Sequence, residues 1–253
     1  MKKKLYIIVS FMLLLISSGC TSSGNDSKQE LNIAAAANFS LAFAEIGKKF
    51  EEDTGIKVIF SFGSTGQLAD QIENGAPFDL FASADKSFVE YLKEKQLLIN
   101  DTAQLFAVGR IGIVTKKDKN VNSIEDLVKE NVVKLAIANP DHAPYGLAAK
   151  QALQSARIWD EVESKLVYGR NISDTLTYVE TGNAEAAIVA KSLVNKDHVR
   201  FILIDEENHQ PIEQMIAVIK RTATEDKARQ FIEFLKGPIG KPIMESYGFK
   251  VPN

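Results

Sequence analysis

The fold is decided by the stretch Val58-Ile59-Phe60-Ser61-Phe62-Gly63-Ser64-Thr65-Gly66-Gln67-Leu68-Ala69-Asp70-Gln71-Ile72. Its first part predicts a strand, because β-branched and aromatic residues dominate it. Its last part predicts a helix, in which Leu68 and Ile72 lie one turn apart. Between the two, a pair of glycines allows a tight turn, and the hydroxyls of Ser64 and Thr65 lie where the helix must begin.

Such a junction can bind an anion, because the first N–H groups of a helix are unpaired and carry partial positive charge. The simpler interpretation is that Ser64 or Thr65 only caps the helix, and a single junction of this kind favours the cap. The chain repeats the arrangement at three more strand-to-helix junctions: Ala37-Asn38, Pro144-Tyr145 and Asn171-Ile172. This repetition favours a shared binding site.

Composition excludes some classes of protein. The chain has 253 residues, of which 45% are hydrophobic, so it can bury a sizeable core in one or two domains. Its formal net charge of −3 argues against a nucleic-acid-binding surface, which needs a clustered basic face. Any anion must therefore be bound by local donors rather than by a strongly positive protein.

The N-terminus has the pattern of a targeting segment. Lys2-Lys3-Lys4 precede an apolar run over residues 5–16, which is too short to span a bilayer. Small residues then precede Cys20, the only cysteine of the chain, in a pattern that resembles the lipobox of bacterial lipoproteins, although Ser17 stands where Leu is commoner. We expect a signal peptide over residues 1–19, lipidation of Cys20, a flexible tether over residues 20–30 and an extracytoplasmic chain anchored to the cell membrane.

Strands and helices alternate along the rest of the chain, which predicts parallel sheets covered by helices. Asn38 or Ser40 is expected to cap the first helix, and Asp85 a later one. Two long β runs, residues 105–115 and 214–220, can carry the chain from one lobe to another and back. We therefore expect two α/β lobes, the first comprising residues 31–107 and 220–253 and the second residues 108–219.

The four junctions should meet in one cleft, because ligands of open parallel sheets bind at the carboxyl ends of the strands. They offer neutral donors only: the Asn38 amide, the Ser64 and Thr65 hydroxyls, the Tyr145 phenol and the N–H of Ile172. This set suits a small anion stripped of water. The sequence has no phosphate-binding G-x-x-x-x-G-K-[ST], no G-x-S-x-G and no H-E-x-x-H, so we expect no enzyme activity.

Each of these residues also has a simpler explanation. Asn38 can be only a helix cap, and Tyr145 only a surface aromatic residue beside a turn. Arg170 can clamp a carboxylate or lie exposed at a rim, and the second alternative is favoured. The three histidines lack the spacing of metal ligands, and His142 is expected only to line a loop.

Five segments together resemble one known family, the molybdate-binding component (ModA) of bacterial ABC importers. In chain order they are Ala34-Ala35-Ala36-Ala37-Asn38-Phe39, Ser61-Phe62-Gly63-Ser64-Thr65-Gly66-Gln67-Leu68-Ala69, Gly75-Ala76-Pro77-Phe78-Asp79-Leu80-Phe81-Ala82-Ser83-Ala84-Asp85, Asn139-Pro140-Asp141-His142-Ala143-Pro144-Tyr145-Gly146, and Leu235-Lys236-Gly237-Pro238 with Tyr247-Gly248-Phe249. Each motif is modest alone, but five in this order are specific.

The resemblance implies a two-lobe periplasmic-binding-protein fold of type II, with a mostly parallel sheet in each lobe. It implies one molybdate or tungstate ion, bound between the lobes by Asn38, Ser64, Thr65, Tyr145 and Ile172. The protein would be a monomer without a cofactor that delivers the ion to a membrane permease. Some family members use a tyrosine that would align with Ala190, so Tyr145 would replace that donor. Sulfate, phosphate or a carboxylate is the alternative ligand.

Overall fold

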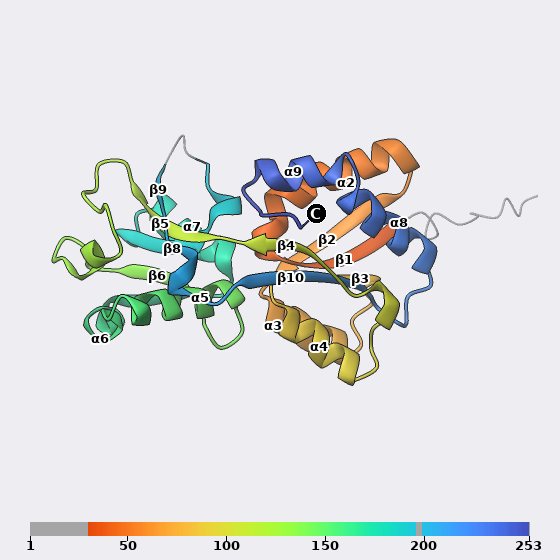
Figure 1. The fold of residues 1–253 in the computed structure, drawn as a ribbon, viewed down its shortest axis with the longest axis horizontal. Helices are drawn as coiled ribbons and strands as arrows, with labels where there is room; N and C mark the ends of the chain where they lie inside the picture. The colour runs from red at the N-terminus through yellow and green to blue at the C-terminus, as the bar shows by residue number, and fades with distance from the viewer. Residues whose placement is uncertain (1–29, 196–198, 253) are drawn as a thin grey trace, which may run out of the picture. The chain divides into compact units, whose positions relative to one another are not determined.

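Two five-stranded sheets form the framework of the chain, which the computed structural model describes for residues 30–195 and 199–252 (Figure 1). The first sheet has the order β2 (Lys57–Gly63), β1 (Glu30–Ala36), β3 (Leu80–Ser83), β10 (Ile212–Val218) and β4 (Gln104–Gly109). The second has the order β7 (Leu166–Gly169), β6 (Leu135–Ala138), β8 (Ala186–Ala190), β5 (Ile111–Lys116) and β9 (Val199–Leu203). The expected signal peptide and Cys20 lie outside the described residues.

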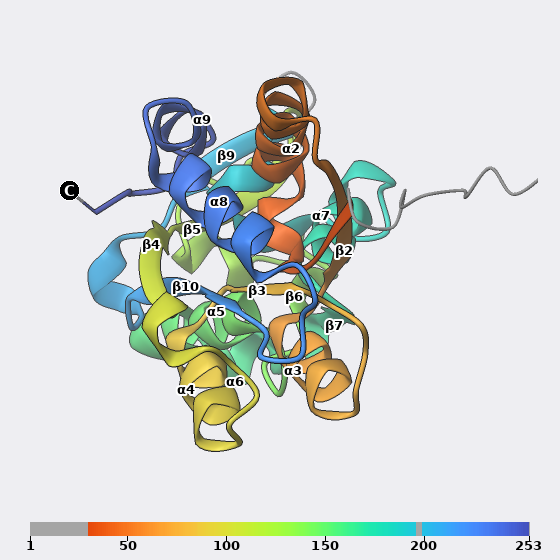
Figure 2. The ribbon, with the colours of Figure 1, turned by 90° about the vertical axis from the view of Figure 1, so that its right-hand side faces the viewer.

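Helices cover both faces of the first sheet. On one face lie α2 (Ser40–Thr54), α8 (Glu225–Lys236) and α9 (Gly240–Ser246), and on the other α3 (Thr65–Glu73) and α4 (Lys86–Glu94), as Figures 1 and 2 both show. The second sheet is accompanied by α5 (Pro144–Ser155), the short α6 (Trp159–Val162) and α7 (Ile172–Glu180). The expected alternation of strands and helices is therefore present in both lobes.

Both sheets are mixed. β3 is parallel to β1, and β6 is parallel to β7 and β8, as the alternation predicts. In each sheet, a strand next to a crossing runs antiparallel to both of its neighbours: β10 between β3 and β4, and β5 between β8 and β9. Each of these two strands is the one by which the chain enters its sheet from the other lobe.

The chain crosses from the first sheet to the second through a single residue. β4 ends at Gly109, β5 begins at Ile111, and Arg110 lies between them. The return crossing lies between β9 and β10. Because β10 pairs with β3 and β4, it belongs to the first sheet, although the expected second lobe (108–219) contained it. It lies between β3 and β4 and pairs with both.

The C-terminal segment makes a third link at the crossing. The guanidinium of Arg110 donates to the carbonyl oxygen of Gly248 from Nε at 3.0 Å and from Nη2 at 2.7 Å. Two residues further on, Lys250 exchanges backbone hydrogen bonds with Val108 of β4, at 2.7 and 3.0 Å. The chain end is thereby fixed to the strand that leads into the second lobe.

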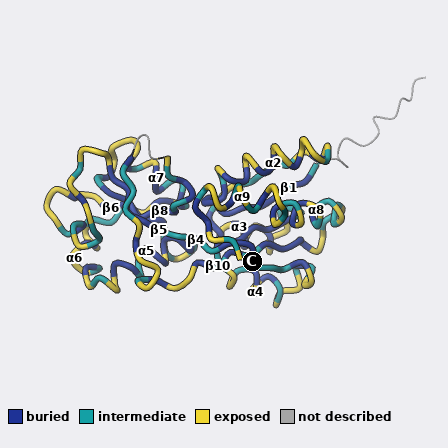
Figure 3. Tube along the Cα trace, turned by 45° about the horizontal axis from the view of Figure 1, so that its top comes forward, coloured by how far each residue is buried: buried dark blue, intermediate teal, exposed yellow. Residues whose placement is uncertain are grey.

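Aromatic side chains form the centre of the first lobe. Phe43 of α2 stacks on Phe39 with ring centroids 4.8 Å apart and meets Phe231 of α8 edge-on at 6.0 Å. Phe106 of β4 packs against the same pair. Figure 3 shows the result along the chain, with buried strands and helices exposed on their outer faces. No described helix is both long and apolar enough to cross a membrane.

The helix starts differ in part from expectation. Asp85 caps α4 as predicted, accepting from the N–H of Ser87 at 2.7 Å. The caps predicted at Asn38 and Ser40 are wrong, because a short 3-10 turn (η3, Ala37–Phe39) precedes α2 and neither η3 nor α2 has a side-chain cap. This turn brings the backbone into the helix without a cap and leaves the Asn38 side chain available for other contacts.

Candidate functional site

The five residues that the sequence assigns to the site line one small cavity. Its walls are Ala36, Ala37, Asn38, Gly63, Ser64, Thr65, Ala84, Ala143, Pro144, Tyr145 and Ile172. The five assigned residues are at most 4% exposed, and no charged side chain is among these described lining residues. An anion in this cavity must therefore be stabilised by dipoles and hydrogen bonds, as the sequence analysis expects.

Each assigned residue follows the carboxyl end of a strand. Asn38 lies in η3 after β1, and Ser64 and Thr65 lie at the start of α3 after β2. On the side of the second sheet, Tyr145 is the second residue of α5, after β6, and Ile172 is the first of α7, after β7. Two junctions of each sheet thus meet at one cavity, in the position that open α/β sheets use for ligands.

Thr65 is oriented as a donor. Its Oγ1 accepts a hydrogen bond from the backbone N–H of Ala84 at 3.2 Å. A hydroxyl has a single proton, and accepting this bond leaves that proton available to a ligand. The same bond fixes the start of α3 to the end of β3.

Ser64 makes its side-chain contacts across the two lobes. Its hydroxyl donates to the carbonyl oxygen of His142 at 2.5 Å, and Nδ1 of the His142 ring lies 2.8 Å from Ser64 Oγ. The N–H of Gly66 also donates to this carbonyl, at 3.0 Å. Ser64 occupies the N-cap position of α3, but its side chain does not cap the helix. The cap interpretation is therefore wrong for Ser64, and His142 does more than line a loop.

Gly66 is required by this close approach of the lobes. A Cβ at its position would lie 3.0 Å from Cβ and from the carbonyl oxygen of His142. Contacts this short are tighter than nearly all real Cβ contacts, so a side chain here would force the His142 loop away.

Tyr145 is buried rather than at the surface, being 2% exposed, so the surface-aromatic interpretation is wrong. Its hydroxyl oxygen accepts hydrogen bonds from Nε2 of Gln214 at 2.7 Å and from Nδ2 of Asn38 at 3.4 Å. Burial raises the pKa of the Tyr145 phenol well above its ordinary value, because a phenolate would lose its hydration. The side chain is therefore a neutral donor at physiological pH.

Asn38 has one unsatisfied atom. Its Nδ2 bonds to Tyr145 and, at 3.5 Å, to Oε1 of Gln214, whereas its buried Oδ1 has no hydrogen-bond partner among the described residues. Buried polar atoms are almost always hydrogen-bonded, so this atom indicates that the cavity receives a polar ligand. Rotation of the amide by 180° exchanges Oδ1 and Nδ2, so Asn38 can offer a ligand either an acceptor or a donor.

Asn171 caps the start of α7, and it is not one of the residues that line the cavity. Its Oδ1 accepts from the N–H groups of Ser173 at 3.0 Å and Asp174 at 2.9 Å. The N–H of Ile172, the first residue of α7, is not used by this cap. Its assigned role as a backbone donor remains a prediction that fits this geometry.

Two other residues lie where they cannot bind a ligand in the cavity. The side chain of Arg170 is 83% exposed, and its Nε lies 3.3 Å from Asp174, so Arg170 is a rim residue as favoured above. Ala190 is buried at the end of β8, paired with Ile111, and is absent from the cavity wall. No described cluster of three or more His, Cys, Asp or Glu side chains could bind a metal ion directly.

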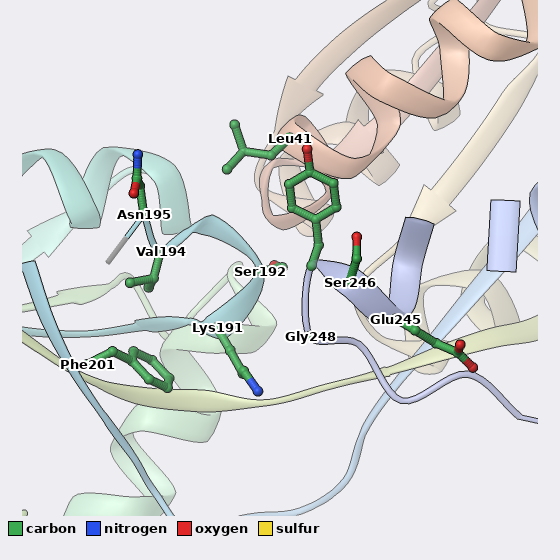
Figure 4. A pocket seen from close by; sticks show the side chains of 10 residues that line it. Leu41, Lys191, Ser192, Val194, Asn195, Phe201, Glu245, Ser246 and Gly248 are labelled. Atoms are coloured by element: carbon green, nitrogen blue, oxygen red, sulfur yellow. The ribbon is translucent and has the colours of Figure 1, made fainter. Parts of the chain in front are cut away.

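A larger hollow of about 550 Å³ lies next to the candidate site (Figure 4). Its lining includes charged residues, Lys191 and Glu245, as well as Leu41 and Ser192. Ser192 connects the two spaces, because its hydroxyl donates to the carbonyl oxygen of Asn38 at 2.7 Å. The mixed lining lacks the uniform neutral donors of the smaller cavity, so we assign the site to the latter.

Sequence analysis did not identify His142, Ser192 or Gln214 as parts of the site. Gln214 had a detectable signal, since it is a polar residue next to the apolar residues Met215–Val218 of a predicted β run. The contacts of His142 and Ser192 depend on how the lobes meet, and nothing in the local sequence indicates this.

The raised pKa of Tyr145 predicts a dependence of stability on pH. An unfolded tyrosine loses its proton near pH ~10, whereas the folded chain retains the proton of Tyr145 above that value. The free energy of unfolding should therefore decrease as the pH rises above ~10, by up to ~1.4 kcal/mol per pH unit for this group. Denaturant titrations between about pH 9 and 11 should show a shallower decrease for Tyr145→Phe; equal slopes would contradict the assignment.

Comparison with known proteins identifies the family. The family described as Bacterial extracellular solute-binding protein matches residues 31–250. The chain is 36% identical over 225 residues to the molybdate-binding protein ModA of Azotobacter vinelandii, covering 87% of this chain and 89% of that protein. It is 33% identical over 260 residues to Bacillus subtilis YvgL, whose name describes an ABC transporter substrate-binding lipoprotein, covering 98% of each.

The fold agrees with these sequences. The periplasmic molybdate-binding protein of A. vinelandii superposes with a TM-score of 0.84 at 27% identity, covering 88% of this chain and 100% of that one. The expected type II periplasmic-binding-protein fold is thereby confirmed, and the antiparallel pairs described above come from one strand of each sheet, β10 and β5. The relatives are named as binding proteins rather than enzymes. The chain therefore belongs to the ModA family of bacterial extracellular solute-binding proteins.

Proposed function

We propose that this protein captures molybdate or tungstate in the cavity between its lobes and delivers it to an ABC permease. One observation carries the proposal: neutral donors from four helix starts surround a buried cavity that no described charged residue lines. The names of the relatives given above support molybdate as the ligand.

The donors suit a fully deprotonated tetrahedral dianion. The hydroxyl protons of Thr65 and Tyr145 are available, because both oxygens already accept bonds from other groups. The N–H of Ile172 adds to them, whereas both protons of Asn38 Nδ2 are used by Tyr145 and Gln214 unless the amide rotates. A hydrogen bond to a charged group contributes roughly 1.5–3 kcal/mol net, and desolvation of the dianion offsets part of the sum. Even four such bonds give only about 6–12 kcal/mol gross, so after this offset the net binding free energy should fall below the ~12 kcal/mol of a nanomolar complex.

Binding requires movement of the lobes, because the residues of the cavity are buried. Three side chains near it donate across the lobes to backbone carbonyls: Ser64 to His142, Ser173 to Ala37 at 3.1 Å, and Ser192 to Asn38. These bonds can form only when the lobes are closed. A bound ligand would contact both lobes only in this closed state and would therefore increase the population of the closed state. We propose that the permease receives the protein in this closed form.

The alternative ligands are sulfate, phosphate and small carboxylates. A carboxylate would be clamped by Arg170, but that side chain is exposed and paired with Asp174. Monohydrogen phosphate carries a proton and needs an acceptor in the site, for which Oδ1 of Asn38 is available. Sulfate is a dianion like molybdate but smaller, and the same donors would reach its oxygens less well.

A panel of oxyanions tests the proposal directly. Thermal unfolding in equal concentrations of molybdate, tungstate, sulfate and phosphate should show the largest increase in Tm with the first two, since stabilisation by a ligand grows with the ratio of its concentration to its Kd. Calorimetric titration then gives the Kd of each ion. A larger shift with sulfate or phosphate would assign the protein to that ion, and no shift with any of them would reject an oxyanion function.

Replacement of Thr65 tests the role of one donor. Thr65→Ala should weaken molybdate binding by about 1–3 kcal/mol, roughly 5- to 150-fold in Kd, because one charge-assisted bond is lost. Thr177→Ala is the matched control: Thr177 is exposed on α7, and its hydroxyl bonds only to the carbonyl of Ser173 among the described contacts. Unchanged calorimetric affinity in Thr65→Ala would remove this hydroxyl from the site.

We further propose that Cys20 is lipidated and anchors the protein to the outer face of the cell membrane. The pattern around Cys20 and the name of the B. subtilis relative support this. Cys20→Ser should move the protein from the membrane fraction to the medium or periplasm and abolish labelling by a radioactive fatty acid. Retention of the variant in the membrane fraction at the wild-type level would contradict lipid anchoring at this residue.

A further inference from the structure

Gln214 is a buried polar residue with no explanation in the packing of its strand. It lies on β10, is 0% exposed, and is followed by the apolar residues Met215–Val218. The pairing of β10 with β4 shifts register between Gln214 and Met215. An apolar side chain would fill such a position at lower cost, since a buried amide must find partners for its polar atoms.

The partners of Gln214 are two residues of the proposed binding site. Its Nε2 donates to Tyr145 Oη at 2.7 Å, and its Oε1 accepts from Asn38 Nδ2 at 3.5 Å. An amide N–H can only donate, so it fixes Oη as an acceptor in this bond. The single proton of the phenol must then point away from Gln214.

Gly109 leaves the space that the side chains of Tyr145 and Gln214 occupy. A Cβ at this position would lie 2.2 Å from Tyr145 Oη and 2.6 Å from Gln214 Nε2, so no larger residue leaves room for both. Gly109 is the last residue of β4, the strand before the first crossing, and Gln214 lies on β10, the strand after the return crossing. The phenol oxygen is thus enclosed by the connecting strands on one side and borders the cavity on the other.

We propose that Gln214 is a positioning residue for ligand binding, which directs the Tyr145 proton into the cavity by donating to its oxygen. The inference rests on the proposed function, because it needs an anion that accepts this proton. An apolar residue at position 214 would leave the phenol free to turn its proton away from the cavity, and its oxygen lone pairs would then face the anion.

A double-mutant cycle tests this proposal. Gln214→Met keeps the side-chain length but removes the donor, and should raise the Kd for molybdate roughly 5- to 30-fold in calorimetry. In the Tyr145→Phe background the same change should alter the Kd by less than about 2-fold, because the hydroxyl it acts on is gone. A merely structural role would weaken binding equally in both backgrounds, and this additive result would overturn the proposal. Gln151→Met, a change on α5 outside the cavity wall, is the control and should leave the Kd unchanged.

A spectroscopic measurement on the wild-type protein covers the case in which Gln214→Met does not fold. Donation by a phenol to an anion shifts tyrosine absorption to longer wavelength, so tungstate should produce a red-shifted difference spectrum that Tyr145→Phe lacks. Binding of tungstate without this signal would overturn the proposal. If wild-type protein binds none of the tested oxyanions, the proposed function fails; if it binds but the cycle is additive, only the role of Gln214 fails.

Discussion

The proposed function depends on one constraint, which is that a doubly charged anion out of water would have to be stabilised by groups without charge. A hydroxyl attracts an oxyanion only when its proton faces it, so the direction of each proton matters as much as its position. An N–H group donates to each hydroxyl oxygen on the side away from the cavity and thereby fixes the direction of the hydroxyl proton. The N–H of Ala84 does so for Thr65, and the amide of Gln214 does so for Tyr145.

The polar groups around the cavity fall into two sets with different tasks. Ser64, Ser173 and Ser192 donate their protons to backbone carbonyls of the opposite lobe, and so hold the lobes together. The hydroxyl protons of Thr65 and Tyr145 are not used by these bonds, because both oxygens act as acceptors, and so remain available to the cavity. Closure and the proposed ligand recognition would therefore use neighbouring residues of similar chemistry without competing for the same protons.

Much of this arrangement can be predicted from the sequence, because it follows local rules. Alternating strands and helices require parallel pairing, and the junctions that carry Asn38, Thr65, Tyr145 and Ile172 must then share one edge of their sheets. The contacts of His142 and Ser192 could not be predicted, since they depend on how closely the two lobes approach. The membership of β10 in the first sheet was missed for a related reason: a crossing strand can pair in either sheet, and its own residues do not indicate which.

The link between the C-terminal segment and the first crossing affects how the lobes can move. A connection of one residue, Arg110, would by itself allow rotation about several axes. The hydrogen bonds from Arg110 to Gly248, whose segment is itself bonded to Val108 of β4, fix the crossing residue to the first lobe and so restrain this rotation. Because the side chain of the crossing residue is fixed to the first lobe, the second lobe has fewer directions in which it can turn about the crossing.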